Sequence, residues 1–222
     1  MMRVVAVIPV LNEERAVESA VCSLPRDVVS RVIVVDGGST DATAQRAAGA
    51  GALVITERRR GYGRACMTGA EAADADVLVF LDGDGSDVGE QAARLVEPVI
   101  AGRFDLVLGS RVRGNRERGS LAAHQMAGNR FVAHVLNRRF GLRLTDVGPF
   151  RAIRTDVLWD LEMTEMTYGW PTQMIRNAAL RGHRITELPV DYRRRLGGRS
   201  KISGDAGASV RAGWQMLRVA VR

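Results

Sequence analysis

The stretch VFLDGDGSD, from Val79 to Asp87, decides the fold. Three apolar residues are followed at once by Asp82 and Asp84, and then by Asp87, with glycines and one serine between them. This pattern predicts a buried strand that ends by placing carboxylates at the edge of a sheet. Two carboxylates in one turn repel each other unless a proton or a cation lies between them. Carboxylate oxygens are the ligands that Mg²⁺ and Mn²⁺ prefer, so Asp82 and Asp84 are candidate metal ligands.

Strands and helices alternate through the first half of the chain. Predicted strands cover residues 3–9, 32–36, 53–56, 77–82 and 106–109, and predicted helices cover 13–24, 40–49, 63–73 and 90–101. The strands are apolar on both faces, which is typical of a parallel sheet covered by helices. We expect Ser39 or Thr40 to cap the helix at 40–49. The alternation predicts an α/β fold with a Rossmann-like, mostly parallel central sheet flanked by helices.

The second half of the chain is less regular. A charged, glycine-containing loop at 111–120 is followed by predicted helices at 121–139, 156–161 and 171–181 and by strands at 150–154 and 185–192. A basic loop at 193–205 precedes a last helix at 208–221, which has apolar and basic faces. No linker or internal repeat divides the chain, so we expect one domain whose second half supplies the other wall of a site.

The composition limits the choice of partners. The 222 residues carry a formal charge of +7, and 46% of them are hydrophobic, which suits one domain with a sizeable core. A basic surface favours nucleic acid, phosphorylated small molecules or an acidic membrane face. Cys22 and Cys66 are isolated in the sequence, which argues against a disulfide framework or a zinc site. No apolar run is long enough to cross a bilayer, so we expect a cytoplasmic protein.

Polar turns follow three of the predicted strands, at residues 9–14, 36–41 and 82–87. In open α/β sheets, ligands bind beyond the carboxyl ends of the strands, so the carboxylates of these turns should gather at one edge. Asp and Gly are also common in such turns because they cap helices and tolerate tight backbone angles. For the turn at 36–41 alone, both interpretations remain open.

Two other classes of function fit parts of the sequence. Haloacid-dehalogenase-type phosphatases also place two aspartates after an apolar strand, and Asp82 would then be the nucleophile. That motif normally opens the sheet, whereas about three predicted strands precede it here. A nucleic-acid-binding module is suggested by charge alone, without an aromatic stacking platform. Nucleotide-binding loops do not fit, because GYGRAC at 61–66 lacks the third glycine of the dinucleotide fingerprint and no P-loop motif occurs.

Seven motifs occur in one order along the chain: IPVLNEE, VVDGGSTD, GYGRA, FLDGDGSD, LGSR, TDVGPFRAI and RLGGRSKISG. Together they resemble family 2 glycosyltransferases with the GT-A fold, and among these the polyprenyl-phosphate and dolichol-phosphate mannose or glucose synthases. The motifs extend from Ile8 to Gly204. The resemblance implies a single GT-A domain over 1–222, with a nucleotide-binding half at 1–110, an acceptor-binding half with the basic loop at 111–204, and an amphipathic helix at 205–222.

The resemblance also implies roles for individual residues. The DxD pair, Asp82 and Asp84, would hold Mg²⁺ or Mn²⁺, and Asp82 would also lie near the ribose. Asp146 matches an acid beside the acceptor, and we take it as the candidate general base. The residues matching nucleotide-sugar-binding positions are Pro9, Leu11, Glu13, Asp36, Gly63, Asp82, Arg195, Ser200 and Lys201. Arg111, Arg130 and Arg151 are candidates for binding the acceptor phosphate, because guanidinium groups suit phosphate oxygens.

The expected reaction is an inverting transfer of a hexose from a nucleotide sugar to a polyprenyl phosphate. A UDP-sugar is our first choice of donor and a GDP-sugar our second, and a soluble hydroxyl acceptor remains an alternative. A cation and the basic loop would neutralise the charge of the leaving diphosphate. The last helix carries Trp214 between arginines, which allows peripheral contact with the inner face of a membrane.

Two positions depart from the motifs of these relatives. Many polyprenyl-phosphate mannose synthases carry Gln where Ser86 stands, two residues beyond the DxD pair. Relatives often carry Glu where Gln173 stands in the stretch YGWPTQMI. If that Glu serves the acceptor or acts as a base, we expect altered acceptor use or reduced activity here.

Overall fold

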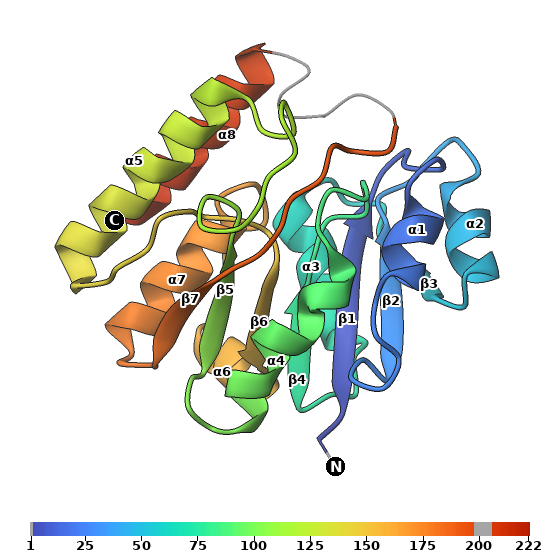
Figure 1. Cartoon of the computed structure of the whole chain (residues 1–222), viewed down its shortest axis with the longest axis horizontal. Coiled ribbons are helices and arrows are strands. Elements are labelled where there is room, and N and C mark those ends of the chain that lie inside the picture. Colours follow the sequence, from blue (N-terminus) through green and yellow to red (C-terminus); the bar gives the residue numbers. More distant parts are fainter. Residues whose placement is uncertain (1, 198–205) are drawn as a thin grey trace.

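Seven strands form one sheet in the described part of the chain, residues 2–197 and 206–222 of a computed structural model (Figure 1). The strands lie in the order β3-β2-β1-β4-β6-β5-β7. Their bounds are β1 Val4–Val10, β2 Arg31–Asp36, β3 Leu53–Thr56, β4 Val77–Phe80, β5 Leu106–Ser110, β6 Arg151–Arg154 and β7 Ile185–Pro189. Only β6 runs antiparallel to its neighbours within this sheet. The predicted α/β, mostly parallel GT-A-type architecture is confirmed.

Helices cover both faces of the sheet. Their bounds are α1 Val17–Cys22, α2 Thr43–Gly49, α3 Tyr62–Glu71, α4 Ala92–Ile100, α5 Ala123–Phe140, α6 Thr155–Asp160, α7 Trp170–Leu180 and α8 Ala206–Val221, with a short 3₁₀ turn at Gly89–Gln91. Alternate residues of each strand point to opposite faces. Val4, Ala6 and Ile8 therefore share a core with α1, α2 and α4, whereas Val5 and Val7 share one with α3 and α5–α8.

Several predicted boundaries were wrong. The first helix begins at Val17 rather than at residue 13, and β7 ends at Pro189 rather than at 192. The second helix begins at Thr43, so neither Ser39 nor Thr40 caps it. The Ser39 hydroxyl donates to Asp36 instead, and the Thr40 amide donates to the Asn12 side chain. These residues tie the turns after β1 and β2 to each other.

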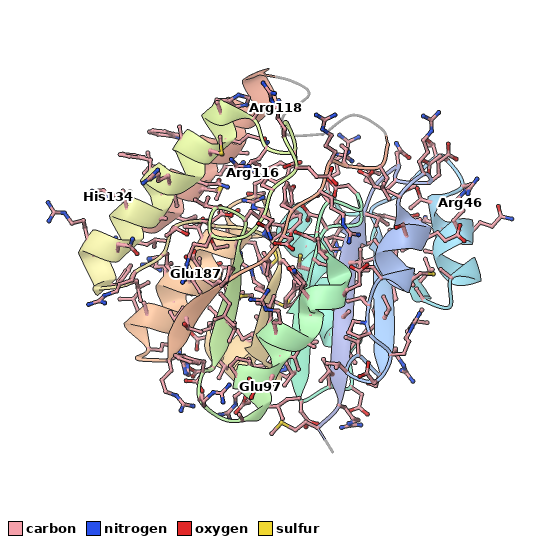
Figure 2. All side chains as sticks on the ribbon, in the orientation of Figure 1. Arg46, Glu97, Arg116, Arg118, His134 and Glu187 are labelled. Carbon is pink, nitrogen blue, oxygen red and sulfur yellow. The ribbon has the colours of Figure 1, made fainter. Side chains whose placement is uncertain are left out.

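The parallel strands β1, β2 and β4 end at the same edge of the sheet (Figure 1). The segment that follows β7 crosses this edge toward the turn after β1. Charged side chains surround the fold, as Figure 2 shows for Arg46 on α2 and Glu97 on α4, both exposed. Within the described ranges, no helix is both long and apolar enough to cross a membrane.

Candidate active site

The turn after β4 gathers three aspartates. The backbone amide of Asp82 donates to Asp87 Oδ2 at 2.9 Å, and the amide of Ser86 donates to Asp84 Oδ1 at 2.9 Å. The Ser86 hydroxyl also donates to Asp84. Asp87 is buried, and its Oδ1 has no hydrogen-bond partner in the part of the chain that the structure describes. The turn thus folds around its own carboxylates and leaves one buried oxygen unsatisfied.

Burial makes ionisation of this turn costly. The pKa of Asp82 lies well above its usual range because of burial and the neighbouring charges of Asp87 and Asp84. Burial also raises the pKa of Asp87 to about 7. Carboxylates so placed need a proton or a cation between them. The oxygen donors and the unsatisfied Asp87 Oδ1 fit a hard divalent cation held by Asp82 and Asp84.

The protein would not complete such a metal site alone. In the described ranges, no three acidic, histidine or cysteine side chains converge as a ready set of metal ligands. Mg²⁺ commonly takes only one or two carboxylates from the protein and fills its coordination with water and substrate phosphates. Asp82 and Asp84 therefore fit a cation that shares its ligands with a bound molecule.

The turns after β1 and β2 supply two further buried acids. Asp36 accepts hydrogen bonds from the Ser39 amide at 2.9 Å and from the Ser39 hydroxyl at 2.5 Å. Glu13 is buried, and its backbone amide donates to Thr43 Oγ1 at 2.8 Å. Pro9 is half-buried near the end of β1, whereas Leu11 is 38% exposed at this edge. Pro9 and Asp36 lie in the last residues of β1 and β2, Leu11 and Glu13 follow β1, and the binding roles of all four stay predictions.

Arg195 joins two of these turns. Its Nη2 donates to both carboxylate oxygens of Glu13, at 2.5 and 2.7 Å, and its Nη1 lies 3.4 Å from Asp84 Oδ2. The backbone amide of Leu196 donates to Asp84 O at 3.1 Å, and that of Arg193 donates to Ser86 O at 2.8 Å. The predicted basic residue therefore meets the acidic edge from a segment over 100 residues away in sequence. Ser200 and Lys201 lie outside the described residues.

Neighbouring protein atoms leave no room for a side chain at Gly63. A Cβ atom at this position would lie 2.7 Å from Glu165 O and 2.7 Å from Trp170 Cβ. The Arg64 amide next to it donates to Met166 O at 3.0 Å. The start of α3 is thereby fixed against the loop that precedes α7. This close approach explains the glycine without a ligand, and contact with a nucleotide stays a prediction.

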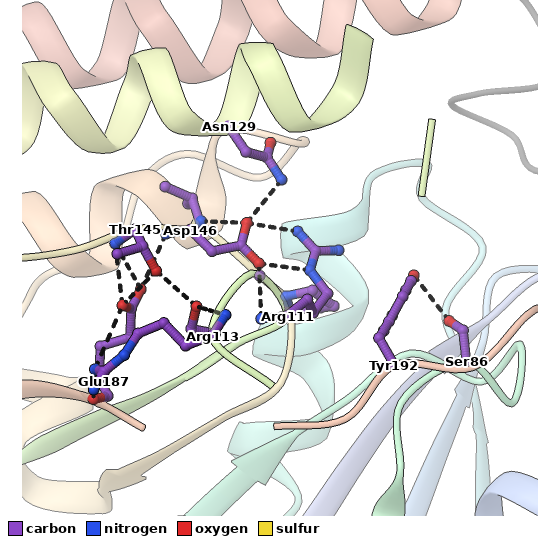
Figure 3. A network of polar contacts seen from close by, with 12 residues as sticks. Ser86, Arg111, Arg113, Asn129, Thr145, Asp146, Glu187 and Tyr192 are labelled. Carbon is purple, nitrogen blue, oxygen red and sulfur yellow. Dashed lines mark hydrogen bonds and ion pairs between the residues drawn. The ribbon is translucent and has the colours of Figure 1, made fainter. Parts of the chain in front are cut away.

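Arg111 and Asp146 form a buried ion pair (Figure 3). Arg111 Nε donates to Asp146 Oδ2 at 2.7 Å, and Arg111 Nη2 donates to Oδ1 at 2.9 Å. Asn129 Nδ2 donates to the same carboxylate at 3.1 Å. Burial would raise the pKa of Asp146, but the charge and hydrogen bonds of Arg111 hold it below its ordinary value. A carboxylate so occupied is a poor proton acceptor, which argues against the general-base role predicted for Asp146, and that role stays a prediction.

Tyr192 links this ion pair to the acidic turn. Its ring lies against the Arg111 guanidinium, with 5.1 Å between the guanidinium carbon and the ring centroid. Its hydroxyl is hydrogen-bonded to Ser86 Oγ at 3.0 Å (Figure 3). The charge of Arg111 in turn lowers the pKa values of Asp82 and Asp87 against the larger effect of burial. No motif marked Tyr192 or Asn129, and Asp87, the last residue of FLDGDGSD, was given no role from the sequence.

The other two predicted acceptor arginines lie in opposite surroundings. Arg151 is fully buried and donates to Pro171 O at 3.0 Å, to Pro149 O at 3.3 Å and to Gly148 O. Burial lowers its pKa to about 10. This enclosed position argues against a direct contact between Arg151 and an acceptor, and the acceptor role of Arg151 stays a prediction. Arg130 is exposed on α5 and has no polar partner among the described residues.

The Gln173 side chain is also hydrogen-bonded within the protein. Its Oε1 accepts from the Thr164 amide at 3.0 Å and the Glu165 amide at 2.7 Å, and its Nε2 donates to Thr164 Oγ1 at 2.9 Å. Gln173 is buried. It therefore anchors the loop before α7 rather than presenting a free polar group to a substrate.

Comparison with known proteins places this architecture in one class of enzyme. The family model described as glycosyl transferase family 2 matches residues 5–162. An uncharacterized glycosyltransferase of Mycobacterium bovis is 35% identical over 211 residues, which cover 93% of each chain. The chain belongs to glycosyltransferase family 2. This membership decides against the phosphatase and the nucleic-acid-binding module that the sequence left open.

Relatives with more specific names cover most of the chain as well. An undecaprenyl-phosphate mannosyltransferase of Micrococcus luteus is 36% identical, with 91% of this chain and 88% of the relative covered. A dolichyl-phosphate hexose transferase of Haloferax volcanii is 32% identical, with 89% and 86% covered. The solved structure of glucosyl-3-phosphoglycerate synthase from Mycobacterium tuberculosis, in complex with Mn²⁺, UDP-glucose and phosphoglyceric acid, superposes with a TM-score of 0.78 at 22% identity. It covers 99% of this chain and 80% of its own, and supports the fold alone.

Proposed function

We propose that this glycosyltransferase moves a hexose from a nucleotide sugar to a polyprenyl phosphate, with inversion at the anomeric carbon. The observation that carries the proposal is the acidic turn of Asp82 and Asp84 beneath the cationic side chain of Arg195. The relatives that act on undecaprenyl phosphate or dolichyl phosphate support the choice of acceptor. A UDP-sugar is the first choice of donor, with a GDP-sugar second, because a protein of the same fold binds UDP-glucose with Mn²⁺.

The donor would lie along the edge formed by β1, β2 and β4. We assign the nucleoside to Pro9 and Asp36, near the ends of β1 and β2, and to Leu11 and Glu13 on the turn after β1. We assign the diphosphate to Mg²⁺ or Mn²⁺ on Asp82 and Asp84. When bound, the cation would neutralise charge that builds on the leaving diphosphate.

Arg195 would also help to neutralise the charge on the leaving diphosphate. In the structure it is paired with Glu13 and Asp84, so it already stands between the two parts of this edge. A donor diphosphate offers oxygens that a guanidinium binds as well as a carboxylate. We therefore propose that Arg195 exchanges carboxylate for phosphate contacts when the donor binds. The roles predicted for Ser200 and Lys201 on the same segment complete this proposal.

The state of Asp146 favours a phosphate acceptor. A hydroxyl acceptor needs a general base within hydrogen-bond reach, whereas a polyprenyl phosphate is already ionised. Asp146 is held by Arg111 and has a lowered pKa, which leaves it unsuited to take a proton. We propose that Arg130, exposed on α5, contacts the acceptor phosphate, and that Arg111 contributes through its charge.

We also propose that the second half of the chain contacts the inner face of a membrane. Helices α5 and α8 lie side by side, away from the sheet edge of β3 (Figure 1). Phe131 on α5 is 55% exposed and Trp214 on α8 is 65% exposed. Exposed aromatic residues beside arginines are typical of helices that lie at a membrane interface. In this arrangement residues 1–110 bind the nucleotide, residues 111–204 supply the acceptor-binding half and the basic loop that closes on the donor, and the helix at 205–222 contacts the membrane.

The proposal is tested by replacing one carboxylate. A ligand that binds only the folded protein stabilises it by about 2.7 kcal/mol at 100 times its Kd. We expect UDP with Mn²⁺ to raise the melting temperature of the wild type and of Asp27→Ala, whose exposed side chain is far from the turn along the chain. Asp84→Ala should lose this shift and at least about 100-fold of its transfer rate to undecaprenyl phosphate.

Two results would count against the proposal. If Asp84→Ala kept the full UDP- and Mn²⁺-dependent shift, the turn would not hold the donor. If sugar reached a soluble alcohol faster than undecaprenyl phosphate in the wild type, the acceptor assignment would be wrong, while the donor assignment would stand.

A further inference from the structure

A cavity of about 400 Å³ lies between α7, α8 and the loop before α7. Thr164, Glu165 and Gln173 line it on one side, and three arginines, Arg176, Arg218 and Arg222, line it together with a valine. None of these side chains comes from the turns after β1, β2 or β4. Ligand pockets in proteins usually measure about 300–1,000 Å³, so the cavity is large enough for a small molecule or a lipid headgroup.

The described side chains that line this cavity carry an excess of positive charge. Three guanidinium groups and one carboxylate leave two net positive charges among the lining side chains. No ion pair within 4.0 Å joins Arg176, Arg218 or Arg222 to an acid in the described ranges. The lone carboxylate, Glu165, instead accepts through Oε1 from the Thr167 amide at 3.0 Å and from the Thr167 hydroxyl.

Arg176 is the arginine of this cavity that carries a buried nitrogen without a hydrogen bond to the described residues. Among the described residues, its buried Nε has no hydrogen-bond partner, and its Nη1 donates to the neighbouring Asn177 Oδ1 at 2.8 Å. Burial, and then the charges of Arg139 and Arg222, lower its pKa. A buried donor without a partner is rare in folded proteins and commonly marks a missing water, ion or ligand.

We propose that this cavity binds a phosphoryl group, carried either by a free phosphorylated compound or by the headgroup of an anionic lipid. The planar donors of arginine match phosphate oxygens in pairs. A doubly charged phosphate monoester balances the two positive charges, which a single carboxylate does not. The site is separate from the acidic edge, so it does not depend on the proposed sugar transfer.

Calorimetric titration of the full chain with inorganic phosphate at low ionic strength tests the site. We expect Arg176→Gln and Arg218→Gln each to weaken phosphate binding at least tenfold. Arg94→Gln, an exposed helix arginine on α4, serves as the matched control and should bind as the wild type does. Arg218 is exposed, so its variant tests the site even if Arg176→Gln fails to fold. Absence of phosphate binding, or equal binding by the Arg218 and Arg94 variants, would overturn the proposal.

Vesicles distinguish the two sources of the phosphoryl group. For a lipid headgroup, Arg218→Gln should weaken binding to phosphatidylglycerol vesicles more than Arg211→Gln, which alters an arginine of the same helix outside the cavity. For a free compound, the two variants should bind vesicles equally while phosphate binding remains dependent on Arg218. Asp84→Ala should leave phosphate binding unchanged, so failure of the donor assignment and failure of this site give different results.

Discussion

In residues 4–110 the polar side chains of the candidate site stand at the ends of β1, β2 and β4, whereas Arg111, Asp146 and Arg195 of the second half stand in loops and pair across the fold. Asp36 and Asp82 are placed by the strands that precede them. Arg111 and Asp146 are placed by each other, 35 residues apart. The site residues of the first half can therefore be recognised from local sequence, whereas those of the second half can be recognised only from the folded structure.

The largest expected loss of stability comes from breaking the buried ion pair between Arg111 and Asp146. Asp146→Ala leaves the Arg111 charge buried without its partner, which costs about 3–5 kcal/mol. Arg154 and Asp156 form a matched control, because their side chains are 40% and 64% exposed. Asp156→Ala should cost less than about 1 kcal/mol. Urea denaturation of the two variants measures the difference, and equal losses would show that the Asp146 pair does not organise this half.

A smaller loss of stability is expected from substitution of Gln173. The motif suggested a role in acceptor use, whereas the structure shows that the side chain holds the loop before α7. Gln173→Ala leaves two backbone amides of the loop before α7 without an acceptor, a cost of about 1–3 kcal/mol. Gln173→Glu keeps the acceptor oxygens and should lose less stability. Thermal denaturation measures both variants.

Activity separates the two interpretations of this position. If Gln173 is only an anchor, the transfer rates of the two variants should follow their stabilities. A Gln173→Glu variant that transfers sugar faster than the wild type, at unchanged stability, would show that a carboxylate serves the chemistry here.

Those features of the site that follow from the order of strands and helices could be predicted from the sequence. Parallel strands end at one edge, so the meeting of Glu13, Asp36 and Asp82 followed from the predicted strands. The sequence could not predict how the residues of β6 pair with those of β4 and β5. Arg151 begins an antiparallel strand between β4 and β5, opposite Phe80 and Leu108, and is therefore enclosed rather than offered to an acceptor.

Long-range pairing was equally hidden. Asp146 looked like a free acid because its partner Arg111 stands in another loop. The expected cap residues Ser39 and Thr40 turned to Asp36 and Asn12, because the turns after β1 and β2 lie side by side. In each case a polar side chain found a partner that no local pattern names.

The smallest expected effect is at the junction of the two halves, where Tyr192 meets Ser86. Tyr192→Phe removes one hydrogen bond and should cost about 0.5–1.5 kcal/mol. Tyr168→Phe is the control, since the Tyr168 hydroxyl has no hydrogen bond in the described ranges. A double-mutant cycle with Ser86→Ala isolates the bond itself. Because Ser86 also donates to Asp84, the Tyr192 variant should weaken Mn²⁺-dependent binding of UDP more than its own loss of stability explains. If the cycle gave no coupling and Mn²⁺-dependent binding were unchanged, the second half would cover the acidic turn without positioning it.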